Sequence, residues 1–328
     1  MIDFMIFRYN FVWDRTRAIR KDITQQHLCD LIAVSLTEKC ARFHIHCAFA
    51  LCEEEPKDFD TKINEENLGN CLQSLKDLYH DLSAFKNIKC PNEEEFRCYD
   101  ILRNLNDRDI VREMQKYDKN IRGSDQVKFA IRVFYALQSN NYIQFFNLLR
   151  KATYLNACLM HRYLNKIRLK AVTVMSRAFK SQKTEFVMIN SDKLAFCLGF
   201  EEIELNLFCS KIGLNFDEQQ RKVRLPRVFR HENFTLSPSR SIIIDSKLTC
   251  PIGQVVHGGQ LPPNPYRMYQ LHDSFDEFGR LKKDSSEVID QQTNASIFQP
   301  KQQLNTSIIQ NKEFIFKEPQ QPVKVNIF

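Results

Sequence analysis

Apolar residues recur every three or four positions over most of the first 180 residues, which is the spacing of one helical face. In the segment 32–52, for example, Cys40, Phe43, Cys47 and Leu51 form such a stripe. Glycine is scarce, with 8 residues in the chain, and this favours helices over a turn-rich β fold. The pattern predicts consecutive helices at 4–28, 32–52, 63–84, 92–104, 107–117, 124–138, 141–150 and 154–180.

Short polar links separate these helices, so we expect them to stack as antiparallel pairs in a degenerate helical repeat, an α-solenoid. The acidic, proline-containing segment 53–60 is predicted to be a loop. Ser124 and Asn140 directly precede two of the helices and are expected to cap them.

The helix at 154–180 has the clearest two-sided pattern. Nine Lys and Arg residues and no Asp or Glu lie between Arg150 and Lys183. At 100° per residue, Arg162, Lys166, Lys170 and Arg177 fall together on the face opposite the apolar one. We interpret this basic stripe as a candidate surface for a polyanion; a lysine-rich helix exposed to solvent is the alternative. The apolar face comprises Ala157, Met160, Leu164, Ile167, Ala171, Val174 and Ala178.

The period changes after residue 180. Glu185–Ile189 is predicted to be a strand, and helices are expected from Ser191 to Leu198 and from Glu201 to Ile212, ended by Gly199 and Gly213. Two further strands are predicted at 214–216 and 223–229 around a polar loop. Helix, strand, helix, helix, strand, loop, strand is the order of a winged helix, in which that loop is the wing.

Regular patterning fades from about residue 231. A strand is predicted at 241–245, and a Gly/Pro-rich loop at 255–265. The remainder is rich in Gln, Asn and Ser and is expected to be disordered. The fold is therefore predicted to be mostly α: a helical-repeat part at 1–160, a winged helix at 161–232, an extended segment at 233–265 that packs on the domain, and a disordered tail at 266–328.

Charge and cysteine content narrow the functional classes. The formal net charge is +7, and the excess lies within residues 1–230, because residues 231–328 contain ten basic and ten acidic side chains. Clustered positive charge suggests a nucleic acid or an acidic protein as partner. Eleven irregularly spaced cysteines indicate reduced thiols and a cytosolic or nuclear protein. No apolar run approaches the ~18 residues of a membrane span, so we expect no membrane association.

Motifs of catalysis are absent from the sequence. It contains no Gly-x-Ser-x-Gly, no phosphate-binding loop and no Gly-x-Gly-x-x-Gly, so we predict neither an enzyme nor a bound cofactor. The best metal candidate is Cys40, His44 and Cys47, with His46 and Cys52 nearby. These side chains lack the paired ligand spacing of zinc sites, so core packing is the preferred interpretation and no metal is predicted.

Cations beside the predicted wing extend the basic stripe. The third winged-helix helix begins with Glu201, Glu202 and Glu204, which phosphates would repel, so reading of a DNA major groove is not expected. These acids are instead predicted to face a protein. An acidic protein is the alternative ligand for the basic surface. The predicted RNA surface, which contacts phosphates without reading bases, comprises Arg162, Lys166, Lys170, Arg177, Arg221, Lys222, Arg224, Arg227 and Arg230.

A second basic cluster lies in the first helix. Val12, Thr16, Ile19 and Ile23 give that helix an apolar side on which the solenoid starts. The cations on its other sides are predicted to form a separate protein-docking face; an internal salt-bridge cluster with Asp14 and Asp22 is the alternative. This face comprises Arg15, Arg17, Arg20 and Lys21, together with Arg42.

The stretch Phe11-Val-Trp13, followed by Asp14-Arg-Thr-Arg-Ala-Ile-Arg-Lys-Asp22, resembles the signature of the GANP family of nuclear mRNA-export scaffolds. The resemblance covers about residues 8–265. Further segments that are similar to the family, in family order, lie at 22–29, 38–47, 71–76, 127–130, 140–146, 154–158, 246–249 and 258–263.

This resemblance implies a helical PCI-like domain closed by a winged helix, which pairs with a PCI-domain subunit. A small acidic protein of the proteasome-lid type would brace that subunit, and the composite surface would bind RNA without sequence preference. The resemblance further implies transcription-and-export complex 2, with transcription machinery and the nuclear pore as partners. The nucleus, the nuclear envelope with its pores and also the cytoplasm are the implied locations.

The expected function is accordingly a non-enzymatic scaffold that couples transcription to the export of poly(A) mRNA. The alternative is a PCI-type scaffold subunit of a proteasome-lid-like or translation assembly that does not bind RNA.

Overall fold

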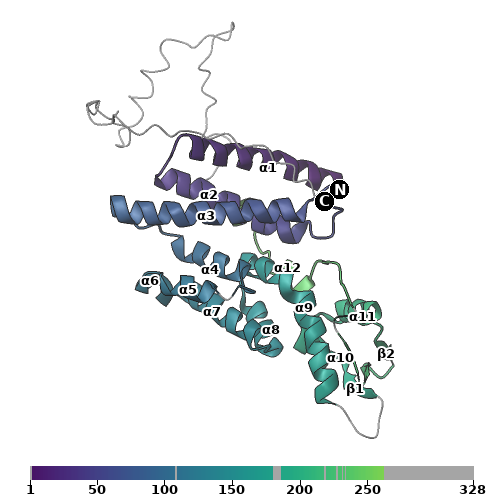
Figure 1. The fold of residues 1–328 in the computed structure, drawn as a ribbon. Coiled ribbons are helices and arrows are strands. Elements are labelled where there is room, and N and C mark those ends of the chain that lie inside the picture. Colours follow the sequence, from purple (N-terminus) through teal and green to yellow (C-terminus); the bar gives the residue numbers. More distant parts are fainter. Residues whose placement is uncertain are drawn as a thin grey trace, which may run out of the picture. The chain divides into compact units, whose positions relative to one another are not determined.

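Three long helices, α1 (Ile2–Gln25), α2 (Leu31–Ala50) and α3 (Thr61–Lys86), lie side by side in Figure 1. A computed structural model describes residues 2–107, 109–179, 186–217, 219–226, 228–230, 232 and 234–261, with side chains from Tyr9 onward. The Asp30 and Asp60 carboxylates accept hydrogen bonds from the first backbone N–H groups of α2 and α3, so both helices begin where a cap is available. Tyr9 packs α1 onto this layer, with its ring 5.9 Å from Phe43 and 5.2 Å from Phe59.

Five shorter helices form the next layer: α4 (Glu93–Arg103), α5 (Ile110–Gln115), α6 (Lys119–Gly123), α7 (Asp125–Gln138) and α8 (Tyr142–Lys151). Ser124 caps α7 as predicted, through Val127 N. The predicted cap of α8 is off by one residue: Asn141 accepts from Gln144 N, while Asn140 adopts a left-handed φ of 54° in the turn. Helix α6 was not predicted; it is a single turn without a buried side chain, so its apolar pattern is weak.

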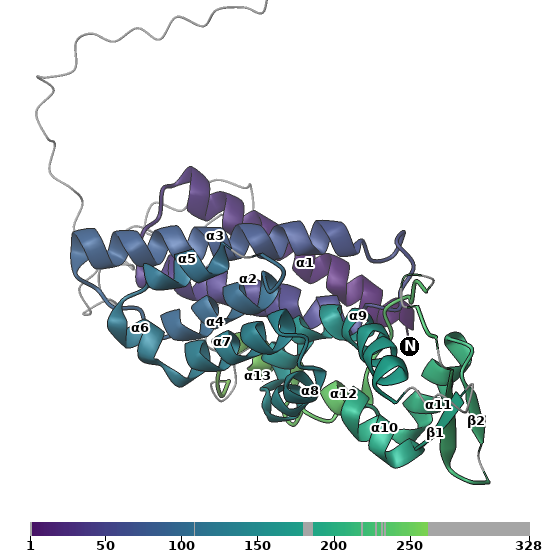
Figure 2. The same cartoon turned by 60° about the horizontal axis from the view of Figure 1, so that its bottom comes forward.

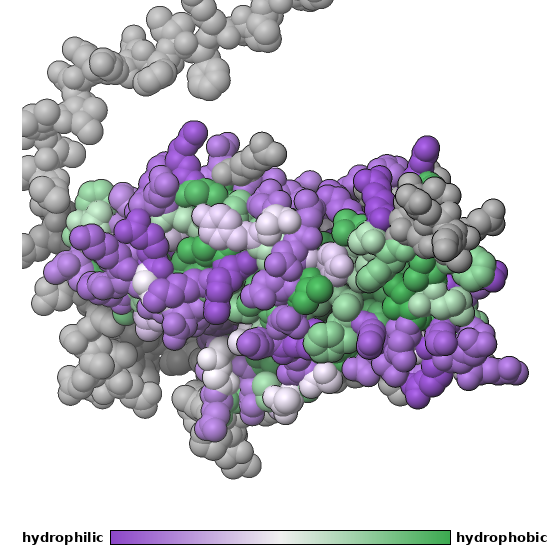
Figure 3. Space-filling model, turned by 90° about the horizontal axis from the view of Figure 1, so that it is seen from below, coloured by the Kyte–Doolittle hydropathy of each residue, from purple (hydrophilic) through white to green (hydrophobic). Residues whose placement is uncertain are grey.

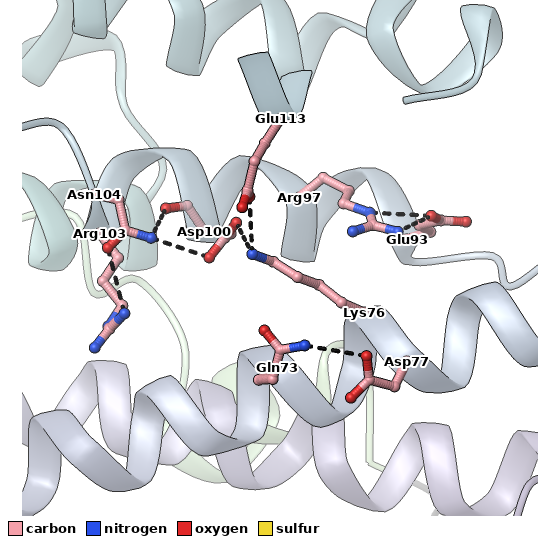
Figure 4. A network of polar contacts seen from close by, with 9 residues as sticks. All are labelled: Gln73, Lys76, Asp77, Glu93, Arg97, Asp100, Arg103, Asn104 and Glu113. Atoms are coloured by element: carbon pink, nitrogen blue, oxygen red, sulfur yellow. Dashed lines mark hydrogen bonds and ion pairs between the residues drawn. The ribbon is translucent and has the colours of Figure 1, made fainter. Parts of the chain in front are cut away.

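An ion-pair network joins α3, α4 and α5 (Figure 4). Lys76 Nζ in α3 lies 2.7 Å from Asp100 Oδ2 in α4 and 3.2 Å from Glu113 Oε2 in α5. Burial raises the pKa of the Asp100 carboxyl, and the positive charge of Lys76 opposes that rise. Asn104 Nδ2 donates to the same carboxylate at 3.1 Å. The network therefore fixes how the short helices lie on α3.

Helix α9 (Tyr154–Ala178) belongs to both halves of the fold (Figure 2). Its residues up to Ile167 pack into the large hydrophobic cluster formed with α2–α8. From Leu169 onward its buried side chains pack instead against the smaller β-containing part, residues 186–226. One rigid helix thus carries side chains of both cores.

The β-containing part consists of β1 (Phe186–Asn190), α10 (Ser191–Leu198), α11 (Glu202–Lys211), β2 (Asn215–Asp217) and β3 (Lys222–Pro226). The three strands form an antiparallel sheet in the order β1-β3-β2, with Met188 opposite Arg224 and Asp217 opposite Lys222. Val223 and Leu225 face the core, so the side chains between them point outward. This order of elements follows the prediction, and Gly199 and Gly213 end their helices with φ of 64° and 70°.

Residues 234–261, here called the strap, run back over the helices. They contain α12 (Ile242–Asp245) and α13 (Ile252–His257). The predicted strand at 241–245 is wrong, because Asp245 N donates to Ser241 O in a helical turn. The predicted loop at 255–265 is partly wrong for the same reason: α13 extends to His257 before Gly258, with φ of 82°, ends it.

The chain divides into two units, Met1–Pro263 and Asn264–Phe328, and the predicted tail at 266–328 falls outside the described residues. The prediction of a mostly helical protein is confirmed for the described ranges. Across these ranges, none of the helices has the length and hydropathy to cross a bilayer.

Candidate functional site

The basic stripe of α9 separates into two parts in the structure. Arg162 Nη1 lies 2.6 Å from Glu65 Oε1 in α3, and Arg103 Nε shares the same oxygen at 2.7 Å. The charge of Arg162 is therefore largely balanced by an acid of its own chain. Farther along the helix, Lys166, Lys170 and Arg177 have no ion pair with a carboxylate within the described part of the chain.

These three cations line a groove of about 520 Å³, here called the basic groove. One wall is the side of α9, and the other is the end of α7 with the turn into α8. Leu137, Phe145 and Ile167 give the groove an apolar floor, while Gln138 and Asn140 bring amides to its edge. The stripe thus becomes a concave site with cations along one side, and no local pattern in the sequence indicated the second wall.

The predicted cations near the wing lie in different surroundings. Arg221, at a left-handed φ of 48°, pairs with Glu202 at 2.8 Å and with Asp192 at 3.1 Å. Lys222 and Arg224 project from the exposed face of β3, where the Arg224 guanidinium lies 3.5 Å from the centre of the Phe186 ring. Arg230 is exposed, whereas Arg227 lies outside the described residues. The exposed sheet face therefore has cations and an aromatic ring, but Arg221 is neutralised.

Two of the three acids at the start of α11 form hydrogen bonds or ion pairs within the chain. Glu204 accepts from the backbone N–H of Glu201 at 3.1 Å, completing a capping box, and its other oxygen accepts from Ile242 N of the strap at 2.9 Å. Glu202 is bound to Arg221. Thus Glu202 and Glu204 stabilise the fold of the chain itself, and of the three acids only Glu202 forms an ion pair among the described residues.

Helix α11 instead exposes two large apolar side chains that the sequence analysis did not single out. Ile203 is 70% exposed and Leu207, one turn later, is 60% exposed. Their i, i+4 spacing places them on one helical face. In Figure 3, hydrophobic residues gather toward the end of the molecule that carries the β-containing part, bordered by hydrophilic ones. An exposed apolar face of this kind is typical of a protein interface.

Arg168 is a buried cation that holds the two cores together. It is 4% exposed, and it donates from Nε to Leu198 O at 3.1 Å and from Nη2 to Gly199 O at 2.7 Å. Its guanidinium also lies 3.6 Å from the centre of the Phe200 ring. Burial lowers the pKa of Arg168 to about 9, so the side chain stays charged at neutral pH. It therefore ties α9 to the carbonyl end of α10.

Most of the cations of the docking face predicted on α1 are exposed. Arg15, Arg17 and Lys21 are exposed, and the first two lie over the rings of Phe11 and Trp13, at 5.4 and 5.5 Å. Arg20 is half-buried and donates to Asn67 Oδ1. Between these cations and Asp14 or Asp22, the described residues form no ion pair, which leaves the internal-cluster alternative without support.

Arg42 does not belong to that face, and this part of the prediction is wrong. Only 2% of Arg42 is exposed, and its guanidinium donates to both oxygens of Glu95 at 2.7 Å. The strap closes over it, because a Cβ at Gly258 would lie 2.6 Å from Arg42 Cζ. Helix α2 is buried on all sides from Cys40 to Cys47, so a cation there has to be paired inside the protein.

The candidate metal ligands pack in the core. His44 shares a hydrogen bond with Asn64 Oδ1 at 2.8 Å, and His46 with Tyr154 Oη at 2.9 Å. Burial lowers the pKa of both imidazoles to about 4, so they are neutral near pH 7. Within the described ranges, His, Cys, Asp and Glu side chains form no group of three or more that could hold a metal ion.

The family match and three similar curated proteins point to the same family. Residues 5–218 match the SAC3/GANP family. The chain is 38% identical over 322 residues to protein xmas of Drosophila melanogaster, which covers 96% of this chain and 15% of that protein. It is 38% identical over 195 residues to SAC3 family protein 1 of Schizosaccharomyces pombe, covering 54% of this chain and 19% of that protein. SAC3 family protein B of Arabidopsis thaliana is 36% identical over 177 residues, covering 50% of this chain and 10% of that protein. The chain therefore spans less than a fifth of each of these relatives.

Proposed function

This chain belongs to the SAC3/GANP family, and we propose that it is a non-enzymatic scaffold of nuclear mRNA export. In this role it is a subunit of transcription-and-export complex 2 and couples transcription to the passage of poly(A) mRNA through the nuclear pore. It does so by binding RNA together with a PCI-domain partner. The observation that carries the proposal is a set of solvent-accessible cations in the basic groove and on the outer face of β3 that have no acidic partner among the described residues.

The proposed architecture is a helical-repeat solenoid closed by a winged helix. Successive helices stacked in layers support the first half of this proposal, and the antiparallel order β1-β3-β2 with α10 and α11 supports the second. The boundary at residues 160–161 falls inside α9, near the point where its side chains pass from one core to the other. The strap, residues 234–261, is proposed to belong to this PCI-like domain, and the proposed boundary at residue 265 lies outside the described residues.

The PCI-domain partner is proposed to dock on α11. The exposed side chains of Ile203 and Leu207 supply an apolar centre, and Glu201 supplies an acid at its edge. A small acidic protein of the proteasome-lid type would brace the partner. Because both side chains are exposed, covering them with a partner would remove apolar surface from water, which favours association.

Replacing Ile203 and Leu207 together by glutamate is expected to weaken binding of the PCI-domain subunit by roughly 30-fold or more, because an interface anchor is worth about 2 kcal/mol. Affinity purification of the tagged chain with quantification of the captured PCI-domain subunit measures the effect. Phe85→Glu is the matched control, since Phe85 is also exposed but lies at the end of α3. Equal capture by the double variant and the control would contradict this interface.

RNA binding is expected to depend steeply on salt. Five cations without an acidic partner in the described residues, Lys166, Lys170, Arg177, Lys222 and Arg224, can each contact one phosphate. If all five do, log Kobs for a single-stranded oligonucleotide falls with log salt at a slope of about −3.5. Titration of the chain together with its partner subunit, over roughly 50–200 mM salt, measures that slope.

No binding at the low-salt end would favour the alternative of a PCI-type scaffold in a proteasome-lid-like or translation assembly. The neutralised charges of Arg162 and Arg221 support that alternative, because they reduce the basic surface available to phosphates.

A second docking face is proposed on α1, with transcription machinery as its partner. Arg15, Arg17 and Lys21 form it, with Arg20 at its buried edge. Charge reversal of Arg17 and Lys21 in the same affinity purification should release this partner while the PCI-domain subunit is retained. An unfolded variant in thermal melts would instead mean that the cluster is structural. The proposed locations are the nucleus, the nuclear envelope with its pores, and the cytoplasm.

A further inference from the structure

A second depression, of about 490 Å³, lies beside the basic groove at the turn between α7 and α8. Ala136 and Gln138 line both hollows, and Arg132 and Tyr135 of α7 line the second one. The two adjacent hollows, here together called the channel, comprise the cations of α9, the amide of Gln138, an aromatic ring and a further cation.

Tyr135 is an exposed aromatic residue in the wall of the second depression. It is 56% exposed, its ring lies edge-on to Phe134 with centroids 5.6 Å apart, and no described residue stacks on its other side. A tyrosine with an open face beside cations is the arrangement that stacks bases of single-stranded nucleic acids. Bases inside a duplex are already stacked on their neighbours and cannot reach such a ring.

The two sides of the channel offer different chemistry. Lys166, Lys170 and Arg177 lie along three turns of α9, which spans about 16 Å at 1.5 Å per residue. Facing them are apolar side chains and the amides of Gln138 and Asn140, and Glu232 is the one acid among the described residues that line the groove. Phosphates fit the first side and bases fit the second. An acidic peptide would use the cations but would leave the aromatic face and the apolar floor without a matching group.

We propose that this channel binds a segment of single-stranded RNA, with one base stacked on Tyr135 and the phosphates on Lys166, Lys170 and Arg177. The inference rests on the RNA binding of the proposed function and assigns that binding a defined path on the helical half of the chain. Arg162 takes no part in it, because Glu65 already occupies its guanidinium.

Binding of a labelled oligo(U) of about 16 nucleotides, the upper end of a single-strand site, tests this path with the full chain and its partner subunit. Tyr135→Ala is expected to weaken binding roughly fivefold to a hundredfold, the range for loss of one stacked base, while Tyr135→Phe binds normally. Lys170→Ala should reduce the salt slope by about 0.7, the contribution of one phosphate contact. Arg162→Ala is the control on the same helix and should bind like the unmodified chain.

The outcomes separate this inference from the function on which it rests. If the unmodified chain binds oligo(U) but Tyr135→Ala and Lys170→Ala bind equally well, the channel is not the path, although RNA binding stands. If the unmodified chain does not bind, the RNA part of the proposed function fails. Polyglutamate that displaces oligo(U) as strongly as unlabelled oligo(U) does would assign the channel to acidic peptides. Thermal melts of each variant exclude unfolding, since Tyr135 and Lys170 are not fully buried.

Discussion

Arg42→Ala should lower the free energy of unfolding by about 3–5 kcal/mol, the usual cost of removing one partner from a buried ion pair. The guanidinium is held by two 2.7 Å bonds to Glu95, lies 3.8 Å from Glu38, and covers the Phe96 ring at 4.8 Å. Its removal leaves the carboxylate of Glu38 buried and that of Glu95 mostly buried without their cation. Chemical denaturation of the chain and the variant measures the difference.

The loss of stability in Arg42→Ala should also depend on pH and should increase as pH rises. Burial already raises the pKa of the Glu38 carboxyl, although Tyr79 and Asn92 donate to it. Without Arg42 this pKa rises further in the folded state but not in the unfolded state. The folded variant then binds more protons than the unfolded one above the ordinary glutamate pKa, so its stability falls as pH rises.

The destabilisation by Arg42→Ala is therefore expected to be smaller near pH 5 than near pH 8. Arg112→Ala is the control, because Arg112 is exposed and lies 4.0 Å from Asp109; it should change stability by about 0.5 kcal/mol or less at both pH values. A larger loss at the lower pH would mean that the carboxylates are not the groups left unpaired.

The burial of Arg42 could not be predicted from the sequence, although the helix that carries it could. The helices were predictable because their apolar positions repeat over three or more turns, as in α9. Whether a cation on such a helix faces water depends on what covers it, and α2 is covered by α1, α3 and the strap. No local pattern around Arg42 contains that information.

Two other predictions differ from the structure, each for its own physical reason. The run Ile242–Ile244 is too short for its period to distinguish a strand from a helix. In the structure Ile244 N and Asp245 N donate to Ser241 O, so the run forms a helical turn. The basic groove was half predictable: its cations lie on one face of α9, but its other wall comes from residues 136–145, which precede them by about thirty positions. Arg168 could have been recognised, because it lies one turn from Leu164 and Ala171 on the apolar face.

Arg168→Ala is expected to cost about 3–5 kcal/mol of stability as well, for a different physical reason. Each charge-assisted hydrogen bond to a carbonyl contributes about 1.5–3 kcal/mol, and Arg168 makes two, to Leu198 O and Gly199 O. Both acceptors lie at the end of α10, where unpaired carbonyls carry partial negative charge. Gly199 cannot move away to find water, because the Phe146 ring lies against it.

Other substitutions of Arg168 distinguish the contribution of its charge to stability from the contribution of its side-chain volume. Arg168→Met fills most of the space but leaves both carbonyls without donors, so it should be less harmful than alanine yet still destabilising. Arg168→Lys keeps the charge but has no planar fork to reach two acceptors, and it should fall between methionine and the native arginine. Arg177→Ala, exposed on the same helix, is the control and should change stability by about 0.5 kcal/mol or less.

Arg168 joins the two cores. We therefore expect Arg168→Ala to weaken binding of the partner subunit under conditions in which most of the chain is still folded. In Arg168→Ala the helical half keeps its own buried cluster, while α10 loses its attachment to α9 and with it the support of α11. We therefore expect capture of the PCI-domain subunit to fall at denaturant concentrations at which far-ultraviolet circular dichroism still reports most of the native helix. Suppose instead that the variant loses capture and helix signal together, at the denaturant midpoint of the unmodified chain. Arg168 would then not be the connection between the two cores.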